Sequence, residues 1–181
     1  MSVVRITAGT LRGRRIEVPK SDVRPTSERA RQAFFNIIGA RLDGARFLDL
    51  FAGTGIFAFE ALSRGASEAV AIDLSRPNTA AIEKNASALA LPLRVIQADV
   101  LVGIKRLGGQ VFDVIYADPP YAYDRYDELL MSIDEHVTLG EDAVVAIEHR
   151  RRSEPFSGTP KRLRHSRTAE YGEVWISFFI A

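Results

Sequence analysis

The stretch from residue 47 to residue 57 constrains the fold of this chain more than any other. It reads as an apolar run that contains Asp49, then a loop with Gly53 and Gly55, then the apolar start of a helix. A strand, a glycine loop and a helix in this order open the nucleotide-binding unit of α/β proteins. Because glycine has no Cβ, both glycines can let the backbone approach a ligand closely. The simpler alternative is a tight turn between strand and helix.

The residues around the glycines favour a cationic ligand over a dinucleotide. A pyrophosphate-binding loop has a third glycine for close helix packing, and Ala58 stands near that position. Asp49 precedes the glycines, where its carboxylate would repel a phosphate. S-adenosylmethionine carries an ammonium and a sulfonium group and has no phosphate. The pattern Asp-x-x-x-Gly-x-Gly therefore points to a methyl donor more than to NAD.

Beyond this loop, short apolar segments alternate with helical ones. We expect strands at 69–72, 93–97, 111–117 and 143–148, helices at 76–89, 100–107 and 126–133, and a C-terminal antiparallel hairpin from 162–167 and 174–180. Such alternation predicts parallel pairing of the strands. The predicted fold class is α/β, a Rossmann-like, mostly parallel, seven-stranded sheet with helices on both faces.

The N-terminal residues predict a separate basic β-hairpin, with strands at 3–8 and 14–18. In the following helix, Arg29 and Arg31 are expected at the start or on the polar face. Its apolar face is expected to hold Ala30, Ala33, Phe34, Ile37 and Ile38. A chain of 181 residues suffices for one buried core. We therefore expect a hairpin extension over residues 1–25 and one domain over residues 26–181.

Charge is distributed unevenly along the chain although the net charge is only +1. Residues 1–46 hold 10 Lys/Arg against 4 Asp/Glu, residues 47–147 hold 7 against 15, and residues 148–181 hold 7 against 4. Clustered Lys and Arg are typical of phosphate binding, so basic ends around an acidic middle favour a nucleic-acid partner. The alternative is that these residues only make the surface soluble.

Acidic residues end the predicted strands, where ligands bind in sheets of this type. They are Asp49, Asp73, Asp99 and Asp118. The separation of Asp73 from Gly53 along the sequence is the one at which a carboxylate reaches ribose hydroxyls in nucleoside-binding folds of this shape. Asp99 is placed to accept a hydrogen bond from an adenine amino group. A single Asp after a strand is usually a helix N-cap, but four in succession are harder to explain in that way.

The sequence Asp118-Pro119-Pro120-Tyr121 follows the strand at 111–117 directly. Two prolines stiffen the loop, so Asp118 and the Pro119 carbonyl can both accept hydrogen bonds from one exocyclic amino group. Tyr121 can stack on the plane of the base. Two acceptors on an aromatic amine localise its lone pair toward an incoming methyl group, so positioning and electrostatics can catalyse the transfer.

Composition excludes several other chemistries. The chain has no cysteine, which excludes thiolate zinc sites and mechanisms with a nucleophilic cysteine. Its start is unlike a secretory signal, and no apolar run is long enough for a membrane span. We therefore expect a cytoplasmic monomer with no metal and no membrane partner. For His136, His149 and His165 we expect surface or packing roles.

Taken together, these motifs resemble class I, amino-directed nucleic-acid methyltransferases, and more narrowly the bacterial RsmD family, which methylates a guanine amino group of 16S rRNA. The residues that carry this resemblance are Arg5 to Gly9 with Arg12 to Arg14, Arg24 to Thr26 with Arg29 and Arg31, Phe35 and Asn36, Asp49 to Gly55, Glu60 to Ala66, Asn85, and Asp118 to Tyr121. Ile56 to Phe59 are bulkier than expected after the family's glycine loop.

The resemblance implies an S-adenosylmethionine-dependent rRNA (guanine-N2)-methyltransferase that releases S-adenosylhomocysteine. It implies a cofactor site at Asp49, Gly53, Gly55, Asp73 and Asp99, and a catalytic loop with Asp118, Pro119 and Tyr121. The partner would be 16S rRNA within a small-subunit particle or an assembly intermediate. Basic residues expected to contact the RNA are Arg5, Arg12, Arg14, Arg15, Arg24 and Arg29.

Three other readings remain open at this point. A DNA adenine-N6 or cytosine-N4 methyltransferase can carry the same loop, although this chain has no room for a target-recognition domain. A nicotinamide-dependent oxidoreductase is disfavoured by the absent third glycine. A non-catalytic RNA-binding module would not need an acid at every strand end.

Overall fold

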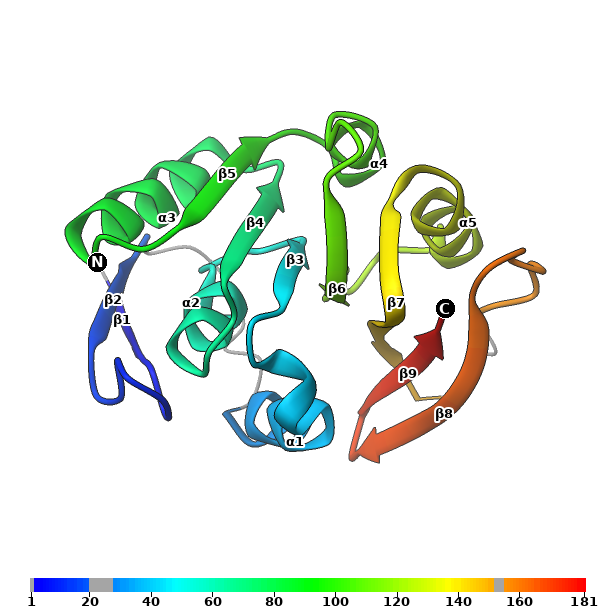
Figure 1. Ribbon diagram of the computed structural model, residues 1–181, viewed down its shortest axis with the longest axis horizontal. Coiled ribbons are helices and arrows are strands. Elements are labelled where there is room, and N and C mark those ends of the chain that lie inside the picture. The colour runs from blue at the N-terminus through cyan, green and yellow to red at the C-terminus, as the bar shows by residue number, and fades with distance from the viewer. Residues whose placement is uncertain (1, 20–27, 152–154) are drawn as a thin grey trace.

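The computed structural model describes residues 2–19, 28–151 and 155–181. Within these residues, seven strands form one sheet in the order β5-β4-β3-β6-β7-β9-β8 (Figure 1). The strands are β3 (Arg46–Leu50), β4 (Glu68–Asp73), β5 (Leu93–Gln97), β6 (Val111–Ala117), β7 (Thr138–Arg150), β8 (Arg164–Tyr171) and β9 (Val174–Ile180). Strands β3 to β7 pair in parallel, and β9 pairs antiparallel with both β7 and β8. The predicted fold class and the C-terminal hairpin are confirmed.

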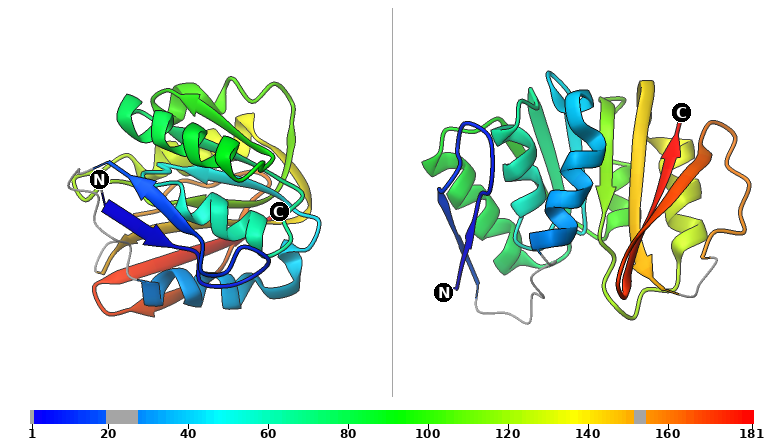
Figure 2. Two further views of the ribbon diagram at one scale, coloured as in Figure 1. Left: turned by 90° about the vertical axis from the view of Figure 1, so that its left-hand side faces the viewer. Right: turned by 90° about the horizontal axis from the view of Figure 1, so that it is seen from below.

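Helices cover both faces of the sheet (Figure 2). They are α1 (Glu28–Ile38), the short 3-10 helix η1 (Gly39–Leu42), α2 (Ile56–Ser63), α3 (Arg76–Ala88), α4 (Val100–Ile104) and α5 (Tyr126–His136). In β4, Ala69 and Ala71 face the core under α1, α2 and α3, while Val70 and Ile72 face the core under α4 and α5. Both faces of the central strands are therefore apolar, as expected for a parallel sheet covered on two sides.

The N-terminal hairpin forms its own two-stranded sheet from β1 (Ser2–Arg5) and β2 (Arg15–Val18). Its strands are shorter than predicted, because residues 6–14 form the connection. At Gly9, φ is +80° and an added Cβ would lie 1.8 Å from the carbonyl oxygen of Ser63, so only glycine allows this loop to contact the end of α2. Figure 2 shows the hairpin against α2 and α3.

Polar side chains attach this hairpin to the domain. The Asn85 side chain on α3 accepts a hydrogen bond from the Glu17 N–H at 3.3 Å and donates one to the Glu17 carbonyl at 2.8 Å. Glu60 on α2 is fully buried and accepts hydrogen bonds from the backbone N–H groups of Thr7 at 3.0 Å and Ala8 at 3.1 Å. The hairpin is therefore fixed to the same helix that begins at the glycine loop.

Several details differ from the sequence-based expectations. Arg31 lies in the first turn of α1, at the start of the helix as expected, but it is only 4% exposed and is therefore not on a polar, solvent-facing surface. Its Nη2 donates to the Arg5 carbonyl at 3.2 Å, and Phe35 joins the buried face instead. Helix α4 ends at Ile104, before the predicted 107, with Lys105 as its C-cap.

No helix in the described parts of the chain has both the length and the apolarity to span a bilayer.

Candidate active site

Acidic side chains meet at one edge of the sheet, where the parallel strands end. Asp49 lies in β3, Asp73 ends β4, and Asp118 follows β6 directly. Asp99 follows β5, two residues beyond its end, and Glu148 lies near the end of β7. All five parallel strands thus bring a carboxylate to the edge at which sheets of this type bind ligands.

The glycine loop between β3 and α2 has a strained backbone. Phe51 has φ of +59°, which is uncommon for a residue with a side chain, and Gly53 and Gly55 have φ of +55° and +74°. A Cβ added at Gly55 would lie 2.8 Å from the Ile82 side chain on α3 and 3.2 Å from Phe59. Backbone conformation and the packing of α2 on α3 therefore both require glycine at position 55, and its predicted contact with a cofactor stays a prediction.

Asp49 is a buried carboxylate, 2% exposed. Within the described residues, one hydrogen bond to its side chain is seen, from the Ala58 N–H to Oδ2 at 3.1 Å. Burial raises the pKa of Asp49 well above the usual range, and the nearby Asp118 and Asp73 carboxylates raise it further against the effect of the Ala58 N–H. A buried carboxyl with so few donors suits a cationic ligand.

Asp73 shapes the glycine loop. Its Oδ2 accepts a hydrogen bond from the Gly53 N–H at 2.7 Å, and its Oδ1 accepts from the Ser75 N–H at 2.8 Å and from the Asn78 side chain at 3.3 Å. This carboxylate therefore orders both the loop and the start of α3. Each oxygen has two acceptor sites, so an additional ribose hydroxyl remains compatible with these contacts.

Asp99 is the N-cap of α4, because its Oδ1 accepts a hydrogen bond from the Leu101 N–H at 3.0 Å. Its side chain is exposed, and its assignment to adenine stays a prediction. Leu74, directly after Asp73, is 69% exposed, which is unusual for a leucine and leaves an apolar surface beside the acids of β4 and β5.

The loop after β6 carries Asp118 to Tyr121, whose predicted contacts with a base stay predictions. Asp118 is half-buried, Pro119 is buried, and Tyr121 is 61% exposed. The guanidinium of Arg150 lies over the Tyr121 ring. A pocket of about 380 Å³ beside them is lined by Tyr121, Ala122, Tyr123, Asp124, Tyr126, Arg150 and Pro155. A second hollow, of about 550 Å³, lies at the opposite edge, where β4 and β5 begin, away from these acids.

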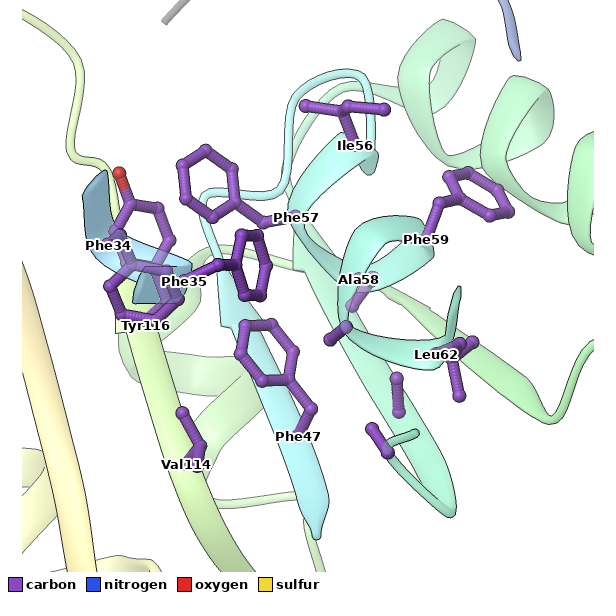
Figure 3. Close-up of a cluster of buried hydrophobic side chains, with 14 of the residues drawn as sticks. Phe34, Phe35, Phe47, Ile56, Phe57, Ala58, Phe59, Leu62, Val114 and Tyr116 are labelled. Atoms are coloured by element: carbon purple, nitrogen blue, oxygen red, sulfur yellow. The ribbon is translucent and has the colours of Figure 1, made fainter. Parts of the chain in front are cut away.

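A cluster of buried aromatic rings lies on the face of the sheet that α1 and α2 cover (Figure 3). The ring of Phe57 stacks on Tyr116 with centroids 3.9 Å apart and an angle of 11° between the planes, and Phe34 packs on Tyr116 at 4.8 Å. Phe57 and Phe59 are buried in the core. Phe57 thus fills the space between α1, α2 and the sheet, whereas Phe59 lies on the other side of α2 (Figure 3).

The sequence reasoning did not assign Glu148 and Tyr116 to the site. The Tyr116 hydroxyl donates a hydrogen bond to Glu148 Oε2 at 2.7 Å. A signal for Glu148 was present, since the strand predicted at 143–148 ends on a carboxylate like the other parallel strands. Tyr116 gave none, because a tyrosine within an apolar strand is typical of a core residue.

Four of the six predicted RNA-binding residues lie on the N-terminal hairpin. Arg5, Arg12, Arg14 and Arg15 are all exposed on the hairpin, and Arg5 is the cross-strand partner of Arg15. Like charges opposite each other destabilise a hairpin, which favours a polyanionic partner. Arg29 is exposed on α1. Arg24 lies outside the described residues.

The histidines have packing or surface contacts, as expected. His149 is buried, its Nε2 lies 2.8 Å from the Ser177 hydroxyl, and burial lowers its pKa. His165 Nε2 lies 3.0 Å from the Thr168 hydroxyl, and His136 lies 3.9 Å from Glu135.

Comparison with known proteins shows the family. A family model described as "Conserved hypothetical protein 95" matches residues 4–180. The Ribosomal RNA small subunit methyltransferase D of Escherichia coli strain K12 is 31% identical over 159 residues, which cover 87% of this chain and 78% of that protein. The chain belongs to the RsmD family.

Other relatives match over almost the full length of this RsmD-family chain. The Bacillus subtilis protein YlbH is 33% identical, and the match covers 97% of this chain and 98% of that protein. The solved structure of the Escherichia coli protein yhhF has a TM-score of 0.88 and 27% identity, and covers 99% of this chain and 98% of that one. The N-terminal hairpin is therefore included in both matches.

Proposed function

We propose that this protein transfers a methyl group from S-adenosylmethionine to the N2 amino group of a guanine in 16S rRNA. The observation that carries the proposal is the placement of the Asp118 to Tyr121 loop beside the acids of β3, β4 and β5, at one edge of the sheet. The family relation to an rRNA small-subunit methyltransferase supports the same substrate class.

The residues present fit this cofactor. The buried carboxyl of Asp49, with its raised pKa, suits the cationic methionine part. Asp73 and the Gly53 backbone would hold the ribose, and Leu74 and Asp99 would contact the adenine face and its amino group. When bound, S-adenosylmethionine supplies an electrophilic methyl group, and its product is S-adenosylhomocysteine.

The base-binding loop would position the amine for this transfer. The Asp118 carboxylate and the Pro119 carbonyl would accept the two amino hydrogens, which directs the nitrogen lone pair toward the methyl group. Tyr121, exposed and beside a pocket of about 380 Å³, would stack on the guanine. After the transfer, the methylated amine releases one proton to solvent water, so the protein needs to supply only positioning and electrostatic stabilisation.

The RNA backbone would bind the basic hairpin, within a small-subunit particle or an assembly intermediate. Arg5, Arg12, Arg14 and Arg15 are exposed there, with Arg29 on α1. We propose the corresponding division into a hairpin extension over residues 1–25 and a methyltransferase domain over residues 26–181. The hairpin is a separate sheet attached through Glu60 and Asn85, which supports this division.

Transfer of tritium-labelled methyl groups to different nucleic acids tests the proposal. Purified protein is incubated with small ribosomal subunits that lack the modification, with naked 16S rRNA and with duplex DNA. The proposal predicts labelling of the ribosomal substrates and none of the duplex DNA. Label on adenine or cytosine of DNA would favour the alternative DNA amino methyltransferase, and no label on either RNA substrate would contradict the proposal.

A further inference from the structure

The edge strand β8 begins in a basic segment that has no part in the function proposed above. Residues 161–167 hold Lys161, Arg162, Arg164 and Arg167 and no acidic residue. Arg162 is used within the fold, because its Nη2 donates a hydrogen bond to the Val137 carbonyl at 3.0 Å. The side chains of Arg164 and Arg167 are exposed, and neither takes part in an ion pair within the described residues.

A β-bulge places these two arginines on one face of the sheet. Arg164 is the partner of Ile180 in β9. Arg167, three residues later, is the partner of Phe178, only two residues before Ile180, because the register shifts between His165 and Arg167. Without this bulge, residues three apart on a strand would point to opposite faces. The Arg167 guanidinium lies over the Phe178 ring, 5.3 Å from its centroid, so both arginines lie on the face that Phe178 shares with α1.

The N-terminal hairpin lies on the same side of the sheet. Its Ile16 and Val18 belong to the core cluster that contains Phe178. The hairpin and β8 lie at opposite ends of the molecule, and α1, on which Arg29 is exposed, lies between them (Figures 1 and 2). Two basic strands therefore border the face that α1 covers, and the strands between them carry the acids of the candidate site.

The acidic residue of β8 is on the other face. Glu170 is the partner of Trp175 in β9, and Trp175 is in turn the partner of His149 in β7. The ring of His149 lies 6.3 Å from that of Tyr126 on α5, so these residues are on the α5 side. The exposed positions of β8 on the α1 side thus carry positive charge that no acid of this strand opposes.

We propose that Arg164 and Arg167 form a second contact surface for the RNA backbone, in addition to the hairpin. Arginines without carboxylate partners attract a polyanion, and a guanidinium can bind two phosphate oxygens at once. An RNA that contacts both the hairpin and β8 crosses the face covered by α1. Because phosphate contacts fix the orientation of a nucleic acid on a protein, the two surfaces together direct the RNA relative to the loop after β6. This inference rests on the proposed function, since it takes its partner from the rRNA substrate.

Charged side chains on an edge strand can also serve a different purpose. They prevent the open edge from pairing with a strand of another chain. This role needs positive charge on β8 but no RNA. It predicts that a variant without the charges self-associates and still binds RNA as the wild type does, so the experiment measures both quantities.

Replacing Arg164 and Arg167 together with Gln tests the proposal. Labelled 16S rRNA is titrated into each protein across a salt series. Affinity at about 0.1 M salt should fall at least about tenfold, and the salt slope should decrease by about 1.4–1.8, since each phosphate contact contributes about 0.7–0.9. The KM for RNA should rise with little change in kcat at saturating RNA. S-adenosylhomocysteine affinity and the sedimentation coefficient should stay unchanged. Replacing both residues with Lys keeps the charge and should retain the wild-type salt slope.

The matched control removes two cations from the other side of the sheet. Arg94 is exposed on β5, the opposite edge strand, where its partner is Val70 of the core under α4, and Arg106 is exposed just after α4. Replacing both with Gln should leave RNA affinity and its salt slope as in the wild type. An equal loss in this control would show that only net charge matters and would overturn the inference. Parallel salt slopes for the wild type and the Arg164 and Arg167 variant would also overturn it, as would self-association of that variant with unchanged RNA affinity.

Hydroxyl-radical footprinting of bound 16S rRNA tests whether one RNA meets both surfaces. The variant of Arg164 and Arg167 should lose protection at nucleotides different from those lost when Arg12, Arg14 and Arg15 are neutralised. Loss at the same nucleotides, or no loss in the β8 variant, would show that β8 is not a separate contact. Neither measurement needs methyl transfer. The expected footprints without any methylation of rRNA would therefore contradict the proposed function and not the second surface.

Discussion

Replacing Glu60 with Gln should detach the basic hairpin from the methyltransferase domain. Glu60 is fully buried, and its two oxygens accept hydrogen bonds from the backbone of Thr7 and Ala8, from the Thr7 hydroxyl and from the Arg64 guanidinium. Arg31, itself buried, lies 3.9 Å away. Glutamine has one acceptor oxygen, and its amide nitrogen would face a donor.

The cost follows from these contacts. Each buried donor left without an acceptor costs about 1–3 kcal/mol, and removing one partner from a buried ion pair costs about 3–5 kcal/mol in total. For a chain of this size, each kcal/mol lowers the Tm by about 2–4 °C, so we expect a fall of about 6–20 °C. Because the broken contacts join residues 7 and 8 to α2, part of the loss should appear as local opening of the hairpin.

Hydrogen exchange of the Thr7 and Ala8 amides, followed with thermal unfolding, measures this effect. In Glu60→Gln both amides should exchange faster, RNA affinity should fall, and S-adenosylmethionine affinity should change little. The matched control is Glu83→Gln on the exposed side of α3, which should leave all four quantities unchanged. Protected amides and an unchanged Tm in the Glu60 variant would refute the assignment of Glu60 as the anchor.

Three further predictions concern the site and its substrate. Asp118→Ala should lower turnover about a hundredfold, because a charged acceptor at the reacting centre contributes on the order of 3 kcal/mol. Cofactor affinity measured by calorimetry should stay within a few-fold of wild type, and near-normal turnover would exclude this role of Asp118. The raised pKa of Asp49 implies that a cationic cofactor binds with release of the carboxyl proton. In calorimetry, cofactor affinity should therefore increase with pH until the pH exceeds the pKa of Asp49 in the cofactor-free protein. Asp49→Asn should bind the cofactor more weakly and without this pH dependence. Neutralising Arg12, Arg14 and Arg15 together should flatten the salt dependence of RNA binding by a slope change of about 2–3 and leave the Tm unchanged, whereas parallel salt slopes would show that these residues contact no phosphate.

The sequence predicted the framework of the fold well because hydrophobic periodicity reports it directly. The strands expected at 93–97, 111–117 and 174–180 have those bounds in the structure. Alternate residues of β4 face two different cores, so a continuous apolar run was the correct signal for a strand buried on both faces. The acids at the strand ends were found for the same reason, since they interrupt apolar runs.

Contacts between distant segments could not be predicted in this way. Arg31 was assigned to the start or the polar face of α1 from its charge, but its partners are the Arg5 carbonyl and Glu60, which are remote in sequence. Glu60 was noted only as part of a motif, although it anchors the hairpin. Gly55 was attributed to ligand approach, while its neighbour in space is Ile82.

The identity of the methylated nucleoside tests the central claim most directly. Small ribosomal subunits that lack the modification are incubated with the protein and methyl-labelled S-adenosylmethionine, and the RNA is digested to nucleosides for chromatography and mass spectrometry. The account predicts that the label appears as N2-methylguanosine and that Asp118→Ala slows its formation about a hundredfold. Label in N6-methyladenosine, or in guanosine methylated at a ring nitrogen, would contradict the account.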